Sequence, residues 1–185
     1  MRILGIAGSL RRGSHNRRLL RAAGDVLPPG ADLVEWEGLG GLPIFDEDLE
    51  STPPEPVREL FEAIEQADAL LIATPEYNAS IPGVLKNAID WASRPRATTP
   101  LQGKPTAVIG ATTGSFGAVW AQADARKVLA SAGARVIALD LPVAKAHEAF
   151  DDAGALHSRD HADRIGEILD ALVAEVETDL TLAAA

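Results

Sequence analysis

Short apolar runs alternate along the chain with longer segments in which apolar residues recur every three or four positions. Two of the runs, residues 2–7 and 69–74, are almost wholly apolar, which is typical of strands buried on both faces of a parallel sheet. The longer segments have the period of amphipathic helices. The pattern predicts strands over 2–7, 31–36, 69–74, 106–110 and 135–141. It predicts helices over 16–26, 57–66, 82–93, 118–132 and 161–177.

Five strands that alternate with helices predict one α/β domain, a doubly wound parallel sheet with helices on both faces and right-handed crossovers. Of the two common strand orders, the shorter one, 2-1-3-4-5, fits better. In that order strands 1 and 3 are neighbours, so the loops that follow them flank one crevice at the carboxyl edge of the sheet. We expect the domain to span residues 1–180 and the alanine-rich end, residues 181–185, to be frayed.

The loop after the first predicted strand, residues 8–16, has the composition of an anion-binding turn. A helix begins directly behind it, so unpaired N–H groups and the positive end of the helix dipole attract negative charge there. Glycine lets the main chain approach a ligand closely, and a guanidinium from Arg11 or Arg12, of which we favour Arg11, suits a phosphate monoester. The side-chain donors of this loop are Ser9, Ser14 and Asn16. A structural alternative stays open, in which Ser14 only caps the helix.

Glycine spacing narrows the class of nucleotide. Gly8 and Gly13 have the spacing of a Walker A loop, but Ser14 and His15 stand where that motif needs lysine followed by serine or threonine. Triphosphate hydrolysis is therefore disfavoured. No Gly-x-Gly-x-x-Gly follows a predicted strand, so a dinucleotide-binding domain has no support. The loop favours a mononucleotide.

Composition limits the chemistry and the partners. The chain has no cysteine, which excludes disulfides, thiolate catalysis, iron–sulfur clusters and cysteine-ligated zinc, so any redox reaction must use a bound cofactor. A formal net charge of −10 disfavours nonspecific binding to nucleic acid. No apolar stretch approaches the roughly 20 residues of a membrane helix, and no signal-peptide pattern precedes the first strand. We expect a cytoplasmic protein that binds neither nucleic acid nor a membrane.

One pair of histidines has metal-ligand spacing. His157 and His161 are four residues apart at a predicted helix start, which places two imidazoles on one side of a helix. Only Asp160 or Asp163 lies close enough in sequence to add a third ligand. Because a protein zinc site needs three or four ligands, we predict no metal site.

Three segments, in this order, support a resemblance to a known family. They are GSLR (residues 8–11) with Ser14 and Asn16, PEYN (75–78) after the third predicted strand, and IPGVLKNAIDW (81–91). The chain resembles the NADPH-dependent FMN reductase family of flavodoxin-like proteins over essentially its whole length. The resemblance implies a flavodoxin-like sheet and bound FMN, with NADPH or NADH as co-substrate. It also implies a ping-pong oxidoreductase that transfers hydride from NAD(P)H to FMN and then to a quinone, azo compound, metal oxyanion or flavin.

The resemblance also assigns residues to the site. The FMN phosphate loop matches Ser9, Leu10, Arg11, Ser14, His15 and Asn16. The loop that borders the isoalloxazine ring matches Pro75, Glu76, Tyr77 and Asn78. The small-residue turn after the fourth strand matches Thr112, Thr113 and Gly114. No side chain is expected to act as a catalytic acid or base, because flavin N5 carries the hydride. The chain departs from the family at Ala118 and Trp120, where relatives often have glycine and arginine.

Several roles and two rival functions stay open. Tyr77 packs near the flavin or only supports its loop, and Glu76 is expected to orient that loop. Trp91 is expected to anchor the core or a subunit interface. One rival is an FMN electron carrier or redox sensor, and the other is a nucleotide N-glycosidase with Glu76 as nucleophile. The resemblance further implies a homodimer or homotetramer whose partner is a small-molecule electron acceptor.

Overall fold

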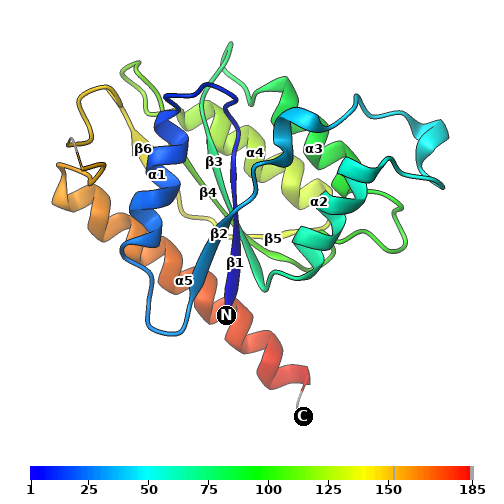
Figure 1. Cartoon of the computed structure of the whole chain (residues 1–185). Coiled ribbons are helices and arrows are strands. Elements are labelled where there is room, and N and C mark those ends of the chain that lie inside the picture. Colours follow the sequence, from blue (N-terminus) through cyan, green and yellow to red (C-terminus); the bar gives the residue numbers. More distant parts are fainter. Residues whose placement is uncertain (152, 184–185) are drawn as a thin grey trace.

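A parallel sheet forms the centre of the structure, a computed structural model that describes residues 1–151 and 153–183. Its order is β2-β1-β3-β4-β5, with β6 paired to β4, which confirms the predicted order of the strands (Figure 1). The strands are β1 (Arg2–Ala7), β2 (Asp32–Glu35), β3 (Ala69–Thr74), β4 (Pro105–Ala111), β5 (Arg135–Val136) and β6 (Pro142–Val143). The loops after β1, β3 and β4 therefore leave the sheet at one edge, at the top of Figure 1.

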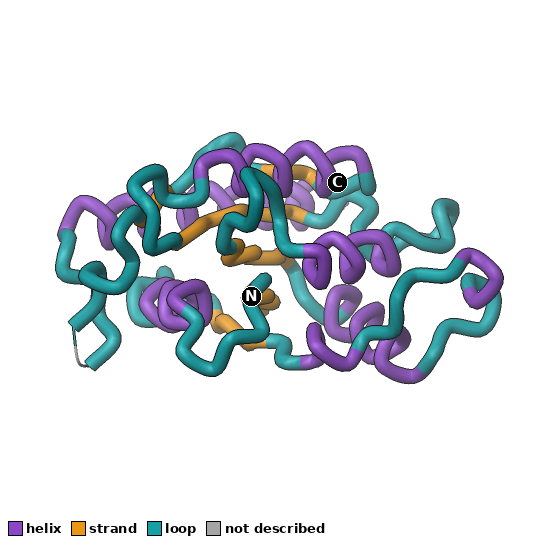
Figure 2. Tube along the Cα trace, turned by 90° about the horizontal axis from the view of Figure 1, so that it is seen from above, coloured by secondary structure: helices purple, strands orange, loops and turns teal. Residues whose placement is uncertain are grey.

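Helices cover both faces of the sheet, so that the strands lie between two helical layers (Figure 2). The helices are α1 (His15–Gly24), α2 (Glu55–Glu65), α3 (Gly83–Ala92), α4 (Val119–Ser131) and α5 (Arg159–Ala183), with the 3₁₀ turns η1 (Gly38–Gly41) and η2 (Glu47–Leu49) after β2. One hydrophobic cluster joins the sheet to α1 and α5, and a second joins it to α2, α3 and α4. The flavodoxin-like, doubly wound fold predicted from the sequence is confirmed.

Successive residues of each central strand point to opposite faces of the sheet. Along β3, Leu71 contributes to the cluster with α1 and α5, whereas Leu70 and Ile72 contribute to the other cluster. All six residues of β3 are buried, which explains why the strand has no polar alternation in the sequence. Trp91 is also fully buried, and its indole N–H donates to the carbonyl oxygen of Pro43 at 2.8 Å, so it is a core residue of this chain.

The fifth predicted strand, residues 135–141, is wrong as a continuous element. On the side of β4 away from β3, the pairing is divided between β5 and β6, and the chain between these two strands leaves the ladder. The side-chain amide of Gln122 occupies the gap, donating to the carbonyl oxygen of Leu141 at 3.1 Å and accepting the N–H of Leu141 at 3.0 Å. Because a side chain from α4 satisfies this main chain, the strand does not need to continue, and the sheet has a short sixth strand.

The last helix extends the domain beyond the predicted boundary. α5 begins at Arg159 and continues to Ala183, so residues 181–183 belong to it. Residues 184–185, the rest of the predicted frayed end, lie outside the described residues. Within residues 1–151 and 153–183, no helix has both the length and the apolar character required to cross a lipid bilayer.

Candidate active site

The three loops that the sequence assigns to the site leave neighbouring strands. β1 pairs with β3 along residues 3–7 and 69–73, and β3 pairs with β4 along residues 70–74 and 106–110. Each strand therefore delivers its loop beside the next one at the carboxyl edge, where doubly wound sheets bind ligands. The predicted convergence of the loop after β1 with the loop after β3 is confirmed.

Gly8 is where the first two loops touch. Its N–H donates to the carbonyl oxygen of Ala73 at 2.8 Å and so continues the strand pairing into the loop. A Cβ at position 8 would lie 3.0 Å from the side chain of Leu85 and 3.3 Å from Pro75. The absence of a Cβ therefore lets the first loop lie against the start of the PEYN segment without displacing Leu85 or Pro75.

Two buried serines organise the start of α1. Ser14 is the N-cap residue, and its hydroxyl oxygen accepts the N–H of Arg17 at 3.2 Å. The hydroxyl oxygen of Ser9 accepts the N–H of Arg11 at 3.4 Å. A hydroxyl that accepts a hydrogen bond still has its own proton to donate. The N–H groups of the first helical turn have no acceptor within the helix, so capping by Ser14 and anion binding are compatible.

Asn16 has a different place from the one that the sequence suggests. It is buried, and its amide nitrogen donates to the carbonyl oxygen of Ala111 at 2.9 Å. Its amide oxygen accepts the N–H of Ala111, also at 2.9 Å. The side chain that was expected to face the phosphate therefore ties α1 to the end of β4, directly before the third loop.

The exposed part of the first loop carries its charges. Arg11 and Arg12 are both exposed, and within the described part of the chain neither forms an ion pair. Leu10 is also exposed, and its side chain lies against the 3₁₀ turn η1, 3.3 Å from where a Cβ on Gly40 would stand. The two guanidinium groups are thus available to an anionic ligand, and their contact with a phosphate stays a prediction.

His15 is partly buried at the first turn of α1. Its ring stacks on Phe150, with the ring centroids 6.4 Å apart and the planes 9° from parallel. Burial lowers the pKa of His15 below its usual 6.5, and the nearby charges of Arg11, Arg18 and His147 lower it further. The imidazole is therefore mostly neutral at pH 7, and its buried Nδ1 atom has no hydrogen-bond partner among residues 1–151 and 153–183.

The PEYN segment ends in a tight turn. Tyr77 and Ser80 exchange two main-chain hydrogen bonds, of 3.0 and 3.1 Å. Between them Asn78 and Ala79 both have left-handed backbone angles, with φ of 53° and 59°, which makes this a type I′ turn. The hydroxyl of Ser80 donates to the carboxylate of Asp124 on α4 and so holds the turn in place. Tyr77 itself is 52% exposed at the rim of the crevice.

Glu76 caps α4 from a distance of 44 residues along the chain. One oxygen of its carboxylate accepts the N–H groups of Trp120 and Ala121, both at 3.1 Å. The N-cap position of α4 is Ala118, which has no side-chain oxygen to do this. The prediction that Glu76 orients its loop gains a physical basis. The sequence indicated a distant cap in one respect only, namely that no Ser, Thr, Asp or Asn immediately precedes α4.

A strained turn presents two aromatic rings before α4. Gly117 and Ala118 both have φ of 61°, and a Cβ on Gly117 would lie 2.4 Å from the main chain of Pro142. The turn leaves Phe116 63% exposed and Trp120 48% exposed, with their ring centroids 5.0 Å apart in an edge-to-face pair. Trp120, one of the two positions where this chain departs from the family pattern, thus forms part of an exposed aromatic pair, and its N–H donates to Glu76.

The third loop is held by the segment after β6. The main-chain oxygen of Thr112 accepts the N–H of Ala146 at 2.9 Å, and that of Gly114 accepts the N–H of Lys145 at 3.0 Å. The hydroxyl oxygen of Thr112 also accepts the N–H of Gly114, at 3.4 Å. Thr113 and Gly114 are exposed on the side of the crevice.

These donors fit a flavin mononucleotide. At one end are two serine hydroxyls, the free N–H groups of α1 and two unpaired guanidinium groups, which suit a phosphate monoester. At the other end are a tight turn and a small-residue loop, bordered by exposed aromatic rings that suit a planar ring. The buried Nδ1 of His15, without a partner, is a further polar atom beside the phosphate end. Which of these groups contact the cofactor stays a prediction.

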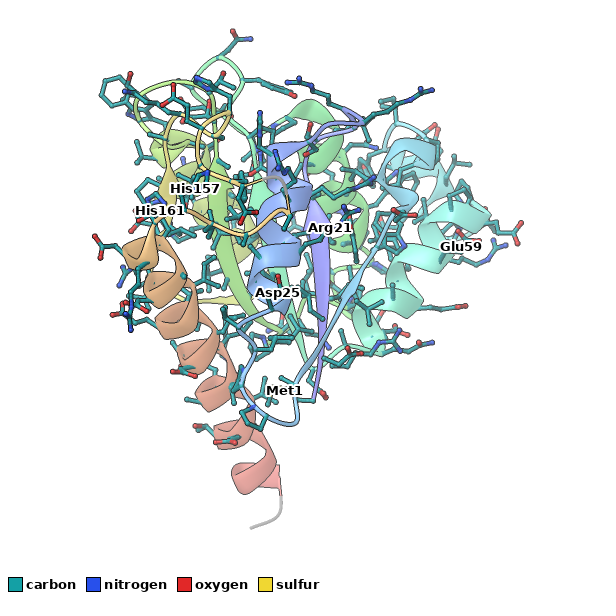
Figure 3. All side chains as sticks on the ribbon, turned by 60° about the vertical axis from the view of Figure 1, so that its left-hand side comes forward. Met1, Arg21, Asp25, Glu59, His157 and His161 are labelled. Carbon is teal, nitrogen blue, oxygen red and sulfur yellow. The ribbon has the colours of Figure 1, made fainter. Side chains whose placement is uncertain are left out.

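The two histidines considered for a metal lie away from this crevice. Figure 3 shows His157 just before α5 and His161 at its start, on the flank of the molecule opposite Glu59. In residues 1–151 and 153–183, three or more His, Asp or Glu side chains nowhere gather in a group that could hold a metal ion.

A family model of the NADPH-dependent FMN reductases matches residues 1–148. The chain belongs to this family. It is 44% identical over 158 residues to an NAD(P)H-dependent FMN reductase of Pseudomonas aeruginosa, with 84% of each chain covered. It is 45% identical over 130 residues to a 2-hydroxy-1,4-benzoquinone reductase of a Burkholderia species, with 70% of each covered. The chain is thus an oxidoreductase with FMN as cofactor and NAD(P)H as reductant, as the sequence predicts.

Solved structures agree with this assignment. The flavoenzyme NAD(P)H:(acceptor) oxidoreductase FerB from Paracoccus denitrificans superimposes with a TM-score of 0.83 and 35% sequence identity, covering 96% of this chain and 97% of FerB. An oxidoreductase from Corynebacterium diphtheriae superimposes with a TM-score of 0.70 at 18% identity, which shows the shared fold alone. The fold is therefore that of a known class of flavoenzymes.

Proposed function

We propose that this protein uses NAD(P)H to reduce quinones in a ping-pong reaction at the crevice formed by the three loops. The observation that carries the proposal is the contact between the phosphate loop and the PEYN segment at Gly8, Ala73 and Pro75, which joins an anion site to a rim for a planar ring. Several curated relatives are named quinone reductases, including one from Pseudomonas putida that is 39% identical over 163 residues. When bound, FMN would supply the hydride-transfer chemistry of both half-reactions.

The residues of the first loop hold and orient the phosphate. Ser9 and Ser14 donate their free hydroxyl protons, and Arg11 supplies a charged fork at the exposed side of the loop. Asn16 acts indirectly, because its amide fixes α1 against β4 through Ala111. The neutral state of His15 leaves the two arginines as the positive charges of this loop.

The main chain of the PEYN turn faces the isoalloxazine ring of FMN in the proposed site. The N–H of Tyr77 is already bonded to Ser80, so the N–H groups of Asn78 and Ala79 are the ones that remain for a ligand. Main-chain donors held in a strained turn can stabilise negative charge on a reduced ring without reorganising. The carboxylate of Glu76 keeps this turn fixed to α4 and takes no part in proton transfer.

The acceptor side of the proposed site carries the exposed rings of Tyr77, Phe116 and Trp120. Planar acceptors such as quinones stack on aromatic side chains, whereas a metal oxyanion gains nothing from them. The aromatic pair is the reason for proposing a quinone as substrate ahead of the other acceptors that the family resemblance implies.

The first test is the visible spectrum of the purified protein before and after reconstitution with FMN. Stopped-flow mixing with NADPH and with NADH should then bleach the bound flavin. In a panel of benzoquinones, naphthoquinones, azo dyes and chromate, the quinones should restore its colour faster than chromate. A colourless protein that takes up no FMN would refute the cofactor site. Flavin that binds but stays oxidised under excess NAD(P)H would instead favour the electron carrier or redox sensor.

The glycosidase rival makes a separate prediction. A nucleophilic carboxylate must face its substrate, but one oxygen of Glu76 is bonded to two N–H groups of α4. Release of free base from a nucleoside monophosphate, lost in Glu76→Gln, would overturn the reductase proposal.

We also propose a homodimer or homotetramer located in the cytoplasm. Exposed Phe116 and Trp120 provide apolar material for a symmetric contact, and NAD(P)H is a cytoplasmic reductant. Analytical ultracentrifugation of the flavin-loaded protein and fractionation of cells test these two statements.

A further inference from the structure

A second concave site lies far from the three loops. α3 and α4 begin at the carboxyl edge of the sheet and run back toward its other edge (Figure 1). A cavity of about 680 Å³ opens between the last turns of these two helices and the segment 93–102, with Phe45 on its wall. Its volume falls within the roughly 300–1,000 Å³ typical of sites for small molecules.

The lining of this cavity is basic although the chain is acidic. Its charged residues are Lys86, Asp90, Arg94, Arg96 and Lys127, four basic side chains and one acidic one. Two of the cations are paired, because the ammonium group of Lys86 lies 2.6 Å from Asp90 and the guanidinium of Arg94 lies 3.9 Å from Glu50. Arg96 and Lys127 are exposed, and neither has an ion-pair partner among residues 1–151 and 153–183.

Helix ends account for only part of this charge. The carboxyl ends of α3 and α4 both lie at the cavity, and each carries roughly half a negative charge, which favours nearby cations. Together the two ends offset about one of the two unpaired charges. About one positive charge at the cavity is therefore not offset, although the chain has a formal net charge of −10 and many acidic residues elsewhere.

The rest of the lining is suited to an organic group. Ile89, Val128 and Phe45 provide an apolar wall, and the hydroxyl groups of Ser93 and Ser131 border it. The guanidinium of Arg94 stands 5.7 Å from the centre of the Phe45 ring, so this wall is rigidly supported next to the cations. A ligand with an anionic end and an apolar or aromatic end matches both parts of the cavity.

We propose that this cavity binds a small phosphate ester, with Arg96 and Lys127 holding the phosphate and the wall of Ile89, Val128 and Phe45 contacting the organic part. A phosphate monoester carries between one and two negative charges at pH 7 and has three acceptor oxygens, so it can pair with a guanidinium and an ammonium together. A carboxylate, with a single charge, leaves one of the two cations unpaired. The cavity shares no lining residue with the three loops of the flavin site.

The test uses the protein saturated with FMN, so that the phosphate loop after β1 is already filled. Adenosine 5′-monophosphate is titrated into it at low salt and followed by calorimetry and by amide chemical shifts. We expect saturable binding with shifts concentrated in residues 86–102 and 127–133. The double variant Arg96→Glu with Lys127→Glu should weaken that binding at least tenfold and leave the flavin spectrum unchanged.

A matched control reverses two exposed arginines elsewhere, Arg21→Glu with Arg159→Glu, and should leave the affinity for adenosine monophosphate within about twofold, since the screening length is short. Inorganic phosphate should bind more weakly than the ester, and equal affinity would contradict the role of the apolar wall. Absence of binding at millimolar ester, shifts confined to residues 8–16, or equal weakening in both double variants would overturn the proposal. So would an oligomer that dissociates in the cavity variant without ever binding the ester, because the face would then be a subunit contact.

Discussion

The side-chain amide of Asn16 forms two hydrogen bonds, each of 2.9 Å, with the main chain of Ala111. The side-chain amide of Asn16 pairs with the main chain of Ala111 through one donated and one accepted hydrogen bond, as neighbouring strands do, although 95 residues separate the two in the chain. The pair joins the helix behind the phosphate loop to the strand in front of the third loop. Two of the three parts of the site are therefore fixed to each other by one buried side chain.

Asn16→Asp should lower both stability and affinity for FMN. A carboxylate can accept the N–H of Ala111 but cannot donate to its carbonyl oxygen, and leaving a buried acceptor unpaired costs about 1–3 kcal/mol. We expect a loss of about 2 kcal/mol in the urea unfolding of the protein without FMN. Fluorescence titration should show weaker FMN binding, because the loop after β1 loses its fixed position.

Asn87→Asp is the control for this change. Asn87 makes the same kind of pair on the other face of the sheet, accepting the N–H of Phe45 at 2.8 Å and donating to Pro43 at 2.9 Å. It should lose less stability than Asn16→Asp, because the carbonyl oxygen of Pro43 still accepts the indole N–H of Trp91, and it should keep its FMN affinity. Equal losses of FMN affinity in the two variants would mean that Asn16 acts only through global stability.

Glu76→Ala should destabilise α4 and loosen the PEYN turn. Removing a capping oxygen costs about 1 kcal/mol, and this carboxylate serves two N–H groups at a helix N-terminus. We expect a lower melting temperature, a higher KM for the quinone and a rate of flavin reduction by NADPH that falls by no more than about tenfold, because the loosened turn aims its N–H groups less well. The comparison is Glu59→Ala, an exposed glutamate on α2, which should change none of these. A rate of flavin reduction that falls by orders of magnitude in Glu76→Ala would show a direct chemical role.

Trp120→Ala should reduce quinone turnover selectively. An aromatic contact contributes about 0.5–1.5 kcal/mol beyond area burial, so kcat/KM for a naphthoquinone should fall about threefold to tenfold. Ferricyanide, which does not stack, should be reduced at the original rate, and the FMN affinity should not change. If kcat/KM fell equally for the naphthoquinone and for ferricyanide, the aromatic pair would not be part of the acceptor site.

His15 should titrate below pH 6.5 in the protein without FMN. Burial, together with Arg11, Arg18 and His147, lowers its pKa, so the unfolded chain binds this proton more readily than the native state. Stability associated with His15 is therefore present above pH 6.5 and is lost as pH falls toward the lowered pKa. Urea unfolding at several pH values should show this loss, and His15→Gln should flatten it. Proton resonances of the imidazole give the pKa directly, and a value at or above 6.5 would contradict the burial argument.

Gly117→Ala should be severely destabilising. The added Cβ meets the main chain of Pro142 at 2.4 Å, and alanine must also adopt a φ of 61°. The conformational cost is about 1–2 kcal/mol, and the steric overlap adds about 1–3 kcal/mol. Gly30→Ala measures the conformational cost without the steric overlap, because Gly30 also has a positive φ, 88°, but has open space around it. Similar unfolding free energies for the two variants would mean that the turn at Gly117 shifts to relieve the overlap.

The sequence predicted those features that depend on local patterns. The apolar run of residues 69–74 identified a doubly buried strand, and Gly8 with Ser14 identified a loop in front of a helix. The alternation of strands and helices, together with the choice of the order 2-1-3-4-5, predicted that β1 and β3 are neighbours and that their loops meet. Each of these inferences used residues close together in the chain.

The parts that the sequence did not predict depend on contacts between distant residues. Gln122 ends the ladder of the fifth strand by bonding to Leu141, and nothing in residues 135–141 announces that interruption. The Glu76 cap likewise belongs to a helix 44 residues away. Asn16 was assigned to the phosphate because an amide at a helix start can bind an anion, but its inward direction depends on where β4 ends.

The interruption of the fifth strand has a consequence for association in solution. An outer strand with many unpaired N–H and C=O groups is a template onto which another chain can add. Here one edge of the sheet is formed by β5 and β6, of two residues each, and the other edge by β2, of four residues. The long central strands β1, β3 and β4 are thereby shielded, and the molecule gives a foreign strand almost no length of main chain on which to begin fibril growth.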